Sequence, residues 1–211
     1  MISIKTFVFS PFQVNTYLVY DETKECIIID AACIEISEEK EISEFIEKHS
    51  LKPVNILNTH GHLDHIFGNK YLKNKYQCDI FGHAADDIVV ANAKAYGAHF
   101  GIDFPEPPPF STHINDNDIL QFGNTSIKVI HTPGHTQGGI SFYFEKDSVL
   151  FSGDTLFQGS IGRTDLPGGN YNTLINSIKT KLLVLPKNTI VYSGHGLSTS
   201  IEKELEGNPF L

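Results

Sequence analysis

The stretch that decides the fold is VNILNTHGHLDH, residues 54–65. Its first half is an apolar run typical of a buried β-strand, and its second half places three histidines and an aspartate within six residues. On a helix, His60 and His62 would point about 200° apart, whereas alternate residues of an extended turn face the same way. The stretch therefore predicts a strand whose exit presents several metal-ligating side chains together.

The same pattern occurs three more times, as an apolar run followed by small or turn-forming residues and then by histidine or aspartate. These stretches are IKVIHTPGH at 127–135, VLFSGD at 149–154 and IVYSGH at 190–195. If the strands share one orientation, their carboxyl ends meet at one edge, where open α/β folds bind ligands. The side chains expected to converge there are His60, His62, Asp64, His65, His135, Asp154 and His195.

Five imidazoles and two carboxylates in one place need a compensating charge, because burying carboxylates alone is costly. Two divalent cations would supply it. Seven ligands divide into two sets of three and one shared carboxylate, which leaves each ion the open position of a catalytic site. Nitrogen and oxygen ligands without thiolate suit zinc as the first choice, and they also suit iron or manganese.

Strand-like and helix-like patterns alternate along the chain, which predicts an α/β protein. Strands are expected at 16–20, 25–31, 54–58, 79–81, 126–130, 140–144, 149–152 and 189–192, and helices at 37–49, 64–76, 84–91 and 172–183. Residues 93–110 contain two glycines and a proline cluster, and we expect them to form a long irregular loop near the mouth of a site.

Composition narrows the function classes. The 211 residues fit a single domain spanning 1–211. The net charge of −9 repels phosphate backbones and anionic lipid, so neither nucleic acid nor a membrane is an expected partner. No apolar run is long enough to span a bilayer and the first residues lack the features of a secretion signal, so we expect a cytoplasmic protein. The three cysteines have no CxxC spacing, which argues against a disulfide framework or a zinc knuckle.

Four segments resemble, in order, the successive metal motifs of the metallo-β-lactamase superfamily. They are THGHLDH at 59–65, HTPGHT at 131–136, GDT at 153–155 and GH at 194–195. The resemblance implies a four-layer αββα sandwich with a dinuclear metal site at one edge of its two sheets. It also implies the ligand sets, which are His60, His62 and His135 for the first metal, Asp64, His65 and His195 for the second, and Asp154 as the bridge.

Within that superfamily the chain is similar to the short glyoxalase II-like hydrolases, through FQGSIGRTDLPGG at 157–169 and NPF at 208–210. This resemblance implies hydrolysis of a small-molecule thioester, an S-2-hydroxyacylglutathione, to a hydroxy acid and a thiol, with Asp64 and Asp154 as catalytic residues. Few residues follow His195, so we expect no C-terminal helical glutathione-binding domain. An aspartate at 154 disfavours antibiotic hydrolysis, because secreted β-lactamases of this superfamily usually carry cysteine or serine in that role.

Arg163 is the one cation of the 157–169 segment. It could bind a substrate carboxylate or phosphate, or form a local ion pair with Asp165. One alternative function is a persulfide dioxygenase, whose single iron would be held by His60, His135 and Asp154. The other is a non-catalytic metal-binding domain, although such a site is normally closed by protein ligands. The sequence does not determine the oligomeric state.

Overall fold

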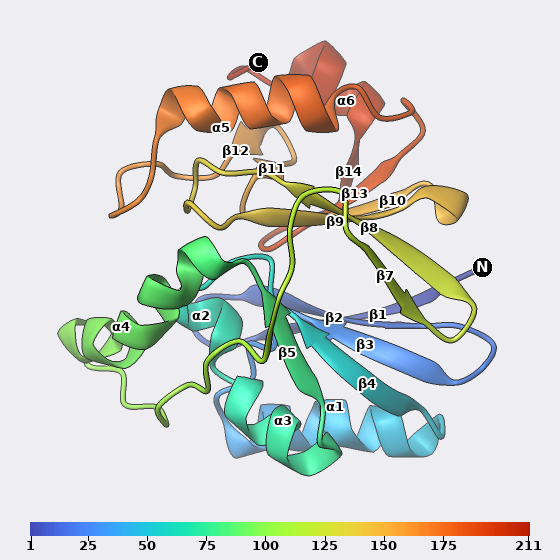
Figure 1. Cartoon of the computed structure of the whole chain (residues 1–211), viewed down its shortest axis with the longest axis vertical. Helices are drawn as coiled ribbons and strands as arrows, with labels where there is room; N and C mark the ends of the chain where they lie inside the picture. Colours follow the sequence, from blue (N-terminus) through green and yellow to red (C-terminus); the bar gives the residue numbers. More distant parts are fainter.

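A computed structural model describes all 211 residues, and it contains two six-stranded sheets packed face to face with helices outside each sheet (Figure 1). The first sheet consists of β1 (Ser3–Phe9), β2 (Val14–Tyr20), β3 (Glu25–Ile29), β4 (Lys52–Leu57), β5 (Asp79–Gly82) and β6 (Thr112–His113), in that order. The second consists of β14 (Thr199–Ser200), β13 (Ile190–Ser193), β10 (Val149–Gly153), β9 (Ile140–Phe144), β8 (Thr125–His131) and β7 (Ile119–Phe122). The short strands β11 (Leu156–Phe157) and β12 (Ser160–Ile161) form a separate hairpin.

The central strands are apolar on both faces because both faces are covered. Successive residues of a strand point to opposite sides of its sheet. Leu18 and Ile28 accordingly pack toward the helices of the first half, whereas Val19 and Ile27 join the core between the two sheets. A third apolar cluster lies between the second sheet and its helices. Three core layers therefore separate four structural layers, which confirms the predicted αββα sandwich.

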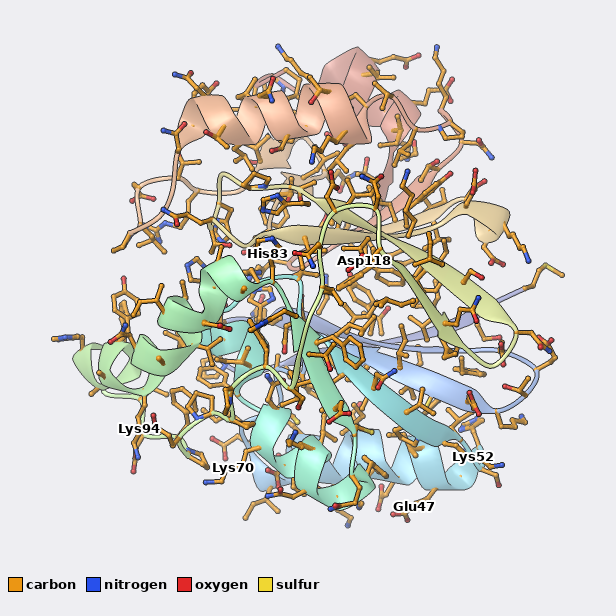
Figure 2. All side chains as sticks on the ribbon, in the orientation of Figure 1. Glu47, Lys52, Lys70, His83, Lys94 and Asp118 are labelled. Atoms are coloured by element: carbon orange, nitrogen blue, oxygen red, sulfur yellow. The ribbon has the colours of Figure 1, made fainter.

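Helices α1 (Ile36–Lys48) and α3 (Asn69–Tyr76) cover the outer face of the first sheet, and α5 (Tyr171–Ser177) and α6 (Ile201–Gly207) cover that of the second (Figure 1). Helices α2 (Leu63–Ile66) and α4 (Asp87–His99) lie toward one side of the sandwich (Figure 1). A π-helical segment, Ile178–Leu182, continues α5, and 3-10 turns occur at Ala84–Asp86 and Glu145–Asp147. Charged side chains such as Glu47, Lys52 and Lys70 lie at the periphery of the molecule (Figure 2). None of the helices combines the length and apolarity needed to cross a bilayer.

Strand direction brings the predicted ligand segments to one edge. In the first sheet β3, β4 and β5 are parallel; in the second, β10 is parallel to β13, and both β8 and β10 are antiparallel to β9. The two sheets are joined at that edge by hydrogen bonds from the amide of Ile140 to the carbonyl of Thr59, at 2.8 Å, and from the amide of Asn15 to the carbonyl of Gly194, at 2.7 Å. Val14 also forms an isolated antiparallel bridge with His195.

The helix predicted over 64–76 is wrong as a single element, because the structure divides it into α2 and α3 at Gly68. The amide of Gly68 donates a hydrogen bond of 2.7 Å to the carbonyl of Ala31 rather than continuing the helix. A Cβ at position 68 would collide with the Sγ atom of Cys33. Close packing on the segment after β3 therefore breaks the helix.

The loop predicted over 93–110 is wrong in its first part. Helix α4 extends to His99, well past the predicted end at residue 91, and the irregular segment begins at Phe100. Gly97 lies inside the helix, and the buried ring of Phe104 packs so close to it that a side chain at position 97 would be crowded. Helix α6 was not identified from the sequence.

We predict that Gly68→Ala lowers the free energy of unfolding by about 1–3 kcal/mol, the usual cost of overpacking a close contact. Chemical denaturation measures the change. The matched control is Gly207→Ala, at the end of α6, where an added Cβ meets nothing. Equal stability of the two variants would contradict the proposed reason for the helix break.

Candidate metal centre

The first group of candidate ligands consists of His60, His62 and His135. One side-chain nitrogen from each lies within 4.8 Å of the others. The first two follow β4 in an extended turn, and His135 lies in the turn after β8. The ring centroid of His135 is 4.8 Å from that of His60 and 4.6 Å from that of His62. Two segments far apart in sequence thus present three imidazoles to one point.

The second group consists of Asp64, His65 and His195, whose ligand atoms also lie within 4.8 Å of one another. Asp64 and His65 belong to the short helix α2, and His195 follows β13. The Oδ2 atom of Asp64 is 3.8 Å from Nε2 of His65 and 3.6 Å from Nε2 of His195. The helix therefore turns two ligands toward the exit of a strand in the other sheet.

Asp154 lies between the two groups. Its Oδ2 atom is 3.7 Å from Nε2 of His135 and 3.5 Å from Nε2 of His195, and its Oδ1 atom is 3.5 Å from Nε2 of His65. The structure thus brings together all seven side chains that the sequence analysis selected. Their assignment as ligands of two ions stays a prediction.

The donor set fits divalent cations. Four buried polar atoms in this cluster have no hydrogen-bond partner, namely Nε2 of His60, His65 and His135 and Oδ1 of Asp154. Buried polar atoms are nearly always paired in folded proteins, so this concentration of unpaired atoms needs a positive ligand. The set contains imidazole and carboxylate but no thiolate, which suits zinc, iron or manganese.

Two histidines of the first group, His60 and His62, are held neutral. Burial, together with the neighbouring imidazoles of His65 and His62, lowers the pKa of His60 well below its usual value. Burial and the imidazole of His135 lower the pKa of His62 to about 4. A neutral imidazole has a free lone pair, so both side chains are ready to bind a cation at neutral pH.

The second group is more basic. Burial alone would lower the pKa of His65, but the carboxylates of Asp154 and Asp30 raise it well above the usual value. Burial also opposes protonation of His195, but the nearby carboxylates of Asp154 and Asp64, 3.5 and 3.6 Å from its Nε2 atom, raise its pKa to about 9. Both shifts favour the doubly protonated, cationic imidazole at neutral pH when no metal is bound.

A second layer of hydrogen bonds orients the imidazoles. Nδ1 of His65 is 2.9 Å from a carboxylate oxygen of Asp30, Nδ1 of His135 is 2.7 Å from the carbonyl of Arg163, and Nδ1 of His195 is 3.0 Å from the carbonyl of Phe12. Each contact leaves Nε2 directed into the cluster, as metal-ligating histidines require.

Sequence reasoning missed Asp30, which accepts hydrogen bonds from the amide and hydroxyl of Thr59 at 2.8 and 2.7 Å besides facing His65. A signal was present, because Asp30 directly follows the apolar strand β3 just as the selected residues follow theirs.

Sequence reasoning also missed Asp86, a fully buried carboxylate that joins the two ligand segments of the first group. It accepts hydrogen bonds from the amide of Gly61 at 2.9 Å, the hydroxyl of Thr136 at 2.8 Å and the amide of Gly138 at 2.7 Å. Asp86 lies in a 3-10 turn before α4, and no local pattern marks it. Only the three-dimensional packing reveals its role.

Arg163 forms the local ion pair that was one of its two predicted roles. Its guanidinium donates to both carboxylate oxygens of Asp165 at 2.8 and 2.7 Å, and both side chains are exposed. The pair lowers the pKa of Asp165 to about 2. The side chain still lines an open pocket beside Asp154 and His195, and a contact with substrate stays a prediction.

Two face-to-face sheets with a histidine and aspartate cluster at one edge define the class of αββα metallo-hydrolases. The sequence matches the metallo-beta-lactamase superfamily over residues 9–195, and the chain belongs to that family.

The chain is 38% identical over 202 residues to the hydroxyacylglutathione hydrolase GloC of Haemophilus influenzae, covering 95% of this chain and 93% of that protein. Its fold is similar to the crystal structure of BLEG-1 B3 metallo-beta-lactamase, with a TM-score of 0.91, 35% identity and 99% of each chain covered. It is also similar to TTHA1623 in a di-iron-bound form, with a TM-score of 0.88, 33% identity, and 98% of this chain and 100% of that chain covered.

We predict that saturating the metal-free protein with zinc at pH 7 releases about two protons from its histidines, because His65 and His195 must lose theirs to bind a cation. Calorimetric titrations in buffers of different ionisation enthalpy measure the release. His195→Ala should release about one proton fewer than the parent protein. The same release from both proteins would contradict the protonation state assigned to His195.

We predict that Asp86→Asn lowers the free energy of unfolding by about 1.5–3 kcal/mol, since an amide replaces one of two accepting oxygens with a donor. Metal affinity should also fall, because the two ligand segments lose their common anchor. Denaturation and competition with a chelator report the two effects. The matched control is Asp87→Asn, at an exposed neighbouring position, where stability should change by less than about 0.5 kcal/mol.

Proposed function

We propose that the protein hydrolyses thioesters, with an S-2-hydroxyacylglutathione as the first substrate to test. The observation that carries the proposal is the convergence of seven imidazole and carboxylate side chains, Asp154 among them, in one cluster. The similarity to GloC, named as a hydroxyacylglutathione hydrolase, supports this substrate class.

The nucleophile in this proposal is water, because the chain offers no better one at the cluster. Cys26, Cys33 and Cys78 are buried and burial raises the pKa of each thiol, to about 12 for Cys33. The hydroxyl of Ser152, the nearest serine in sequence to Asp154, is committed to the carbonyl of Leu156 at 2.9 Å.

A pair of bound divalent cations supplies an acidified water molecule and polarises the thioester carbonyl group. Asp64 and Asp154 are carboxylates at neutral pH, since burial opposes ionisation but the facing imidazoles lower the pKa of each below its usual value. Asp64 orients the attacking water, and Asp30 and the carbonyl of Phe12 fix the rings of His65 and His195.

The reaction forms a carbon–oxygen bond to water and breaks the carbon–sulfur bond. The products are a carboxylate and a thiol, and one proton of the water goes to solvent while the other goes to the departing sulfur. A thiolate with a pKa near about 8.5 leaves without strong acid assistance.

The mononuclear iron dioxygenase remains an alternative that uses only His60, His135 and Asp154. Two observations favour a dinuclear hydrolase. Asp64, His65 and His195 form a second complete group of ligand atoms, and the similar protein TTHA1623 has a di-iron-bound form. We propose zinc as the first choice of metal, with iron or manganese as the others.

The similarity to BLEG-1, named as a B3 metallo-beta-lactamase, makes β-lactam hydrolysis a second candidate. The same water and cluster would attack a lactam carbonyl. An amide nitrogen leaves less readily than a thiolate and needs a general acid to protonate it. The only acidic or basic side chains of the cluster are the candidate metal ligands themselves. Thioester cleavage is therefore the more accessible reaction for this site.

We predict that the metal-loaded protein hydrolyses S-lactoylglutathione and that His62→Ala and Asp154→Ala lose metal and at least about 100-fold in kcat/KM, as loss of a metal's ligand implies. Thiol release and elemental analysis measure the two effects. His113→Ala changes an exposed histidine outside the cluster and should match the parent protein.

Retention of both metal and turnover in His62→Ala and Asp154→Ala would overturn the proposal. Faster cleavage of a chromogenic cephalosporin than of any thioester would instead favour the β-lactam reaction. Oxygen consumption with glutathione persulfide, together with a single iron per chain, would favour the dioxygenase.

A further inference from the structure

An apolar cavity of about 390 Å³ adjoins the first group of candidate ligands at His62. It lies between helix α4 and the segment that precedes α5, and both lie on the same side of the sandwich (Figure 1). Most of its lining is hydrocarbon, from Leu63, Ala85, Ile88, Val89, Ala93 and Leu166. Its polar side chains, His62 included, are neutral at neutral pH, and its lining contains no lysine, arginine, aspartate or glutamate.

A second, more open pocket of about 600 Å³ begins at the other end of the cluster, at Asp154 and His195. Arg163 and the polar side chains of Gln158 and Ser160 contribute to its lining. The two pockets have no lining residue in common. A molecule whose reacting carbon lies at the cluster therefore has an uncharged, mostly apolar space on one side. On the other side it has an open pocket that combines charged and polar groups with the apolar side chains of Phe157, Ile161 and Leu197.

We infer that the apolar cavity is the acyl subsite and that the protein prefers thioesters with an extended hydrocarbon acyl group over those with a short hydroxyacyl group. This inference rests on the proposed thioester hydrolysis and specifies its substrate class. The polar pocket with Arg163 then takes the thiol.

The charges of the thiol part of the substrate determine which pocket receives the thiol and which receives the acyl group. A thiol such as glutathione carries two carboxylates and an ammonium group, and placing these groups in the apolar cavity without partners would be costly. Burial of a hydrocarbon chain has no such desolvation cost and is favoured by the hydrophobic effect. The polar pocket also gives a charged thiol access to solvent and to the guanidinium of Arg163.

The cavity has the size of a small-molecule site, since ligand pockets typically measure about 300–1,000 Å³. A two-carbon acyl group would leave most of its apolar wall exposed to water. Each further methylene that enters the cavity should raise kcat/KM by about fourfold until the cavity is filled.

The test is a series of S-acylglutathiones from acetyl to octanoyl, with S-lactoylglutathione included, assayed on the metal-loaded protein. We expect kcat/KM to rise by about fourfold per methylene over the first part of the series. A flat or falling series would overturn the inference while leaving thioester hydrolysis in place. A matched series of acetyl thioesters of alkyl thiols should show a smaller dependence on length; the opposite result would assign the cavity to the thiol and also overturn the inference.

Two substitutions test whether the dependence of kcat/KM on acyl length arises in the apolar cavity. Ile88→Ser and Leu166→Ser remove hydrocarbon from opposite walls of the cavity and should reduce the ratio of octanoyl to acetyl kcat/KM by at least about tenfold. Val184→Ser is the matched control, because Val184 is 68% exposed, close to the 67% of Ile88, and lies outside the cavity. Equal ratios in all three variants would overturn the assignment.

Binding without turnover separates the inference from the proposed function. Ketone analogues, in which a methylene replaces the thioester sulfur, cannot be hydrolysed, and calorimetry measures their affinity. Affinity that increases with acyl length and falls in Ile88→Ser supports the cavity assignment, whether or not the protein turns over thioesters. Absence of thioester turnover together with this binding pattern would contradict only the proposed function. Affinity independent of acyl length overturns the cavity assignment.

Discussion

The buried carboxylate of Asp30 is the contact on which the candidate metal centre depends. It fixes the amide and hydroxyl of Thr59, at the exit of β4, and faces the imidazole of His65. One side chain therefore joins the end of β3 to the segment that carries four of the seven ligands. Removing one partner of such a network leaves the others buried and unpaired, which costs more than the lost hydrogen bond itself. The positions of these four ligands therefore depend on how the parallel strands β3 and β4 pack side by side.

Two pairs of histidines in the cluster differ in basicity because their surroundings differ. Burial and neighbouring imidazoles lower the pKa of His60 and of His62. The carboxylates of Asp64 and Asp154 raise the pKa of His65 and of His195. Protons on His65 and His195 would therefore offset part of the negative charge of the two carboxylates when no cation is bound, and metal binding would replace these protons.

Much of the fold and all seven candidate ligands could be predicted from the sequence, because strand exits carry a local signal: an apolar run and then a turn with histidine or aspartate. The failures have a common physical origin in contacts between distant residues. Gly68 lies at the helix break, where Cys33 packs against it, and Gly97 lies inside a helix, where Phe104 packs against it. Asp86 connects segments that meet only in the folded protein. The pairing of Arg163 with Asp165 was one of the two roles predicted for Arg163, because the two residues are near each other in sequence.

The bridge between Val14 and His195 fastens the last candidate ligand to the beginning of the chain. Asn15 reinforces this closure with side-chain hydrogen bonds to the carbonyls of Ser193 and Gly196. His195 is thus positioned by β2 of the first sheet as well as by β13 of the second. Separation of the two sheets at this point would displace a ligand of the second group, whereas the first group, His60, His62 and His135, does not include His195.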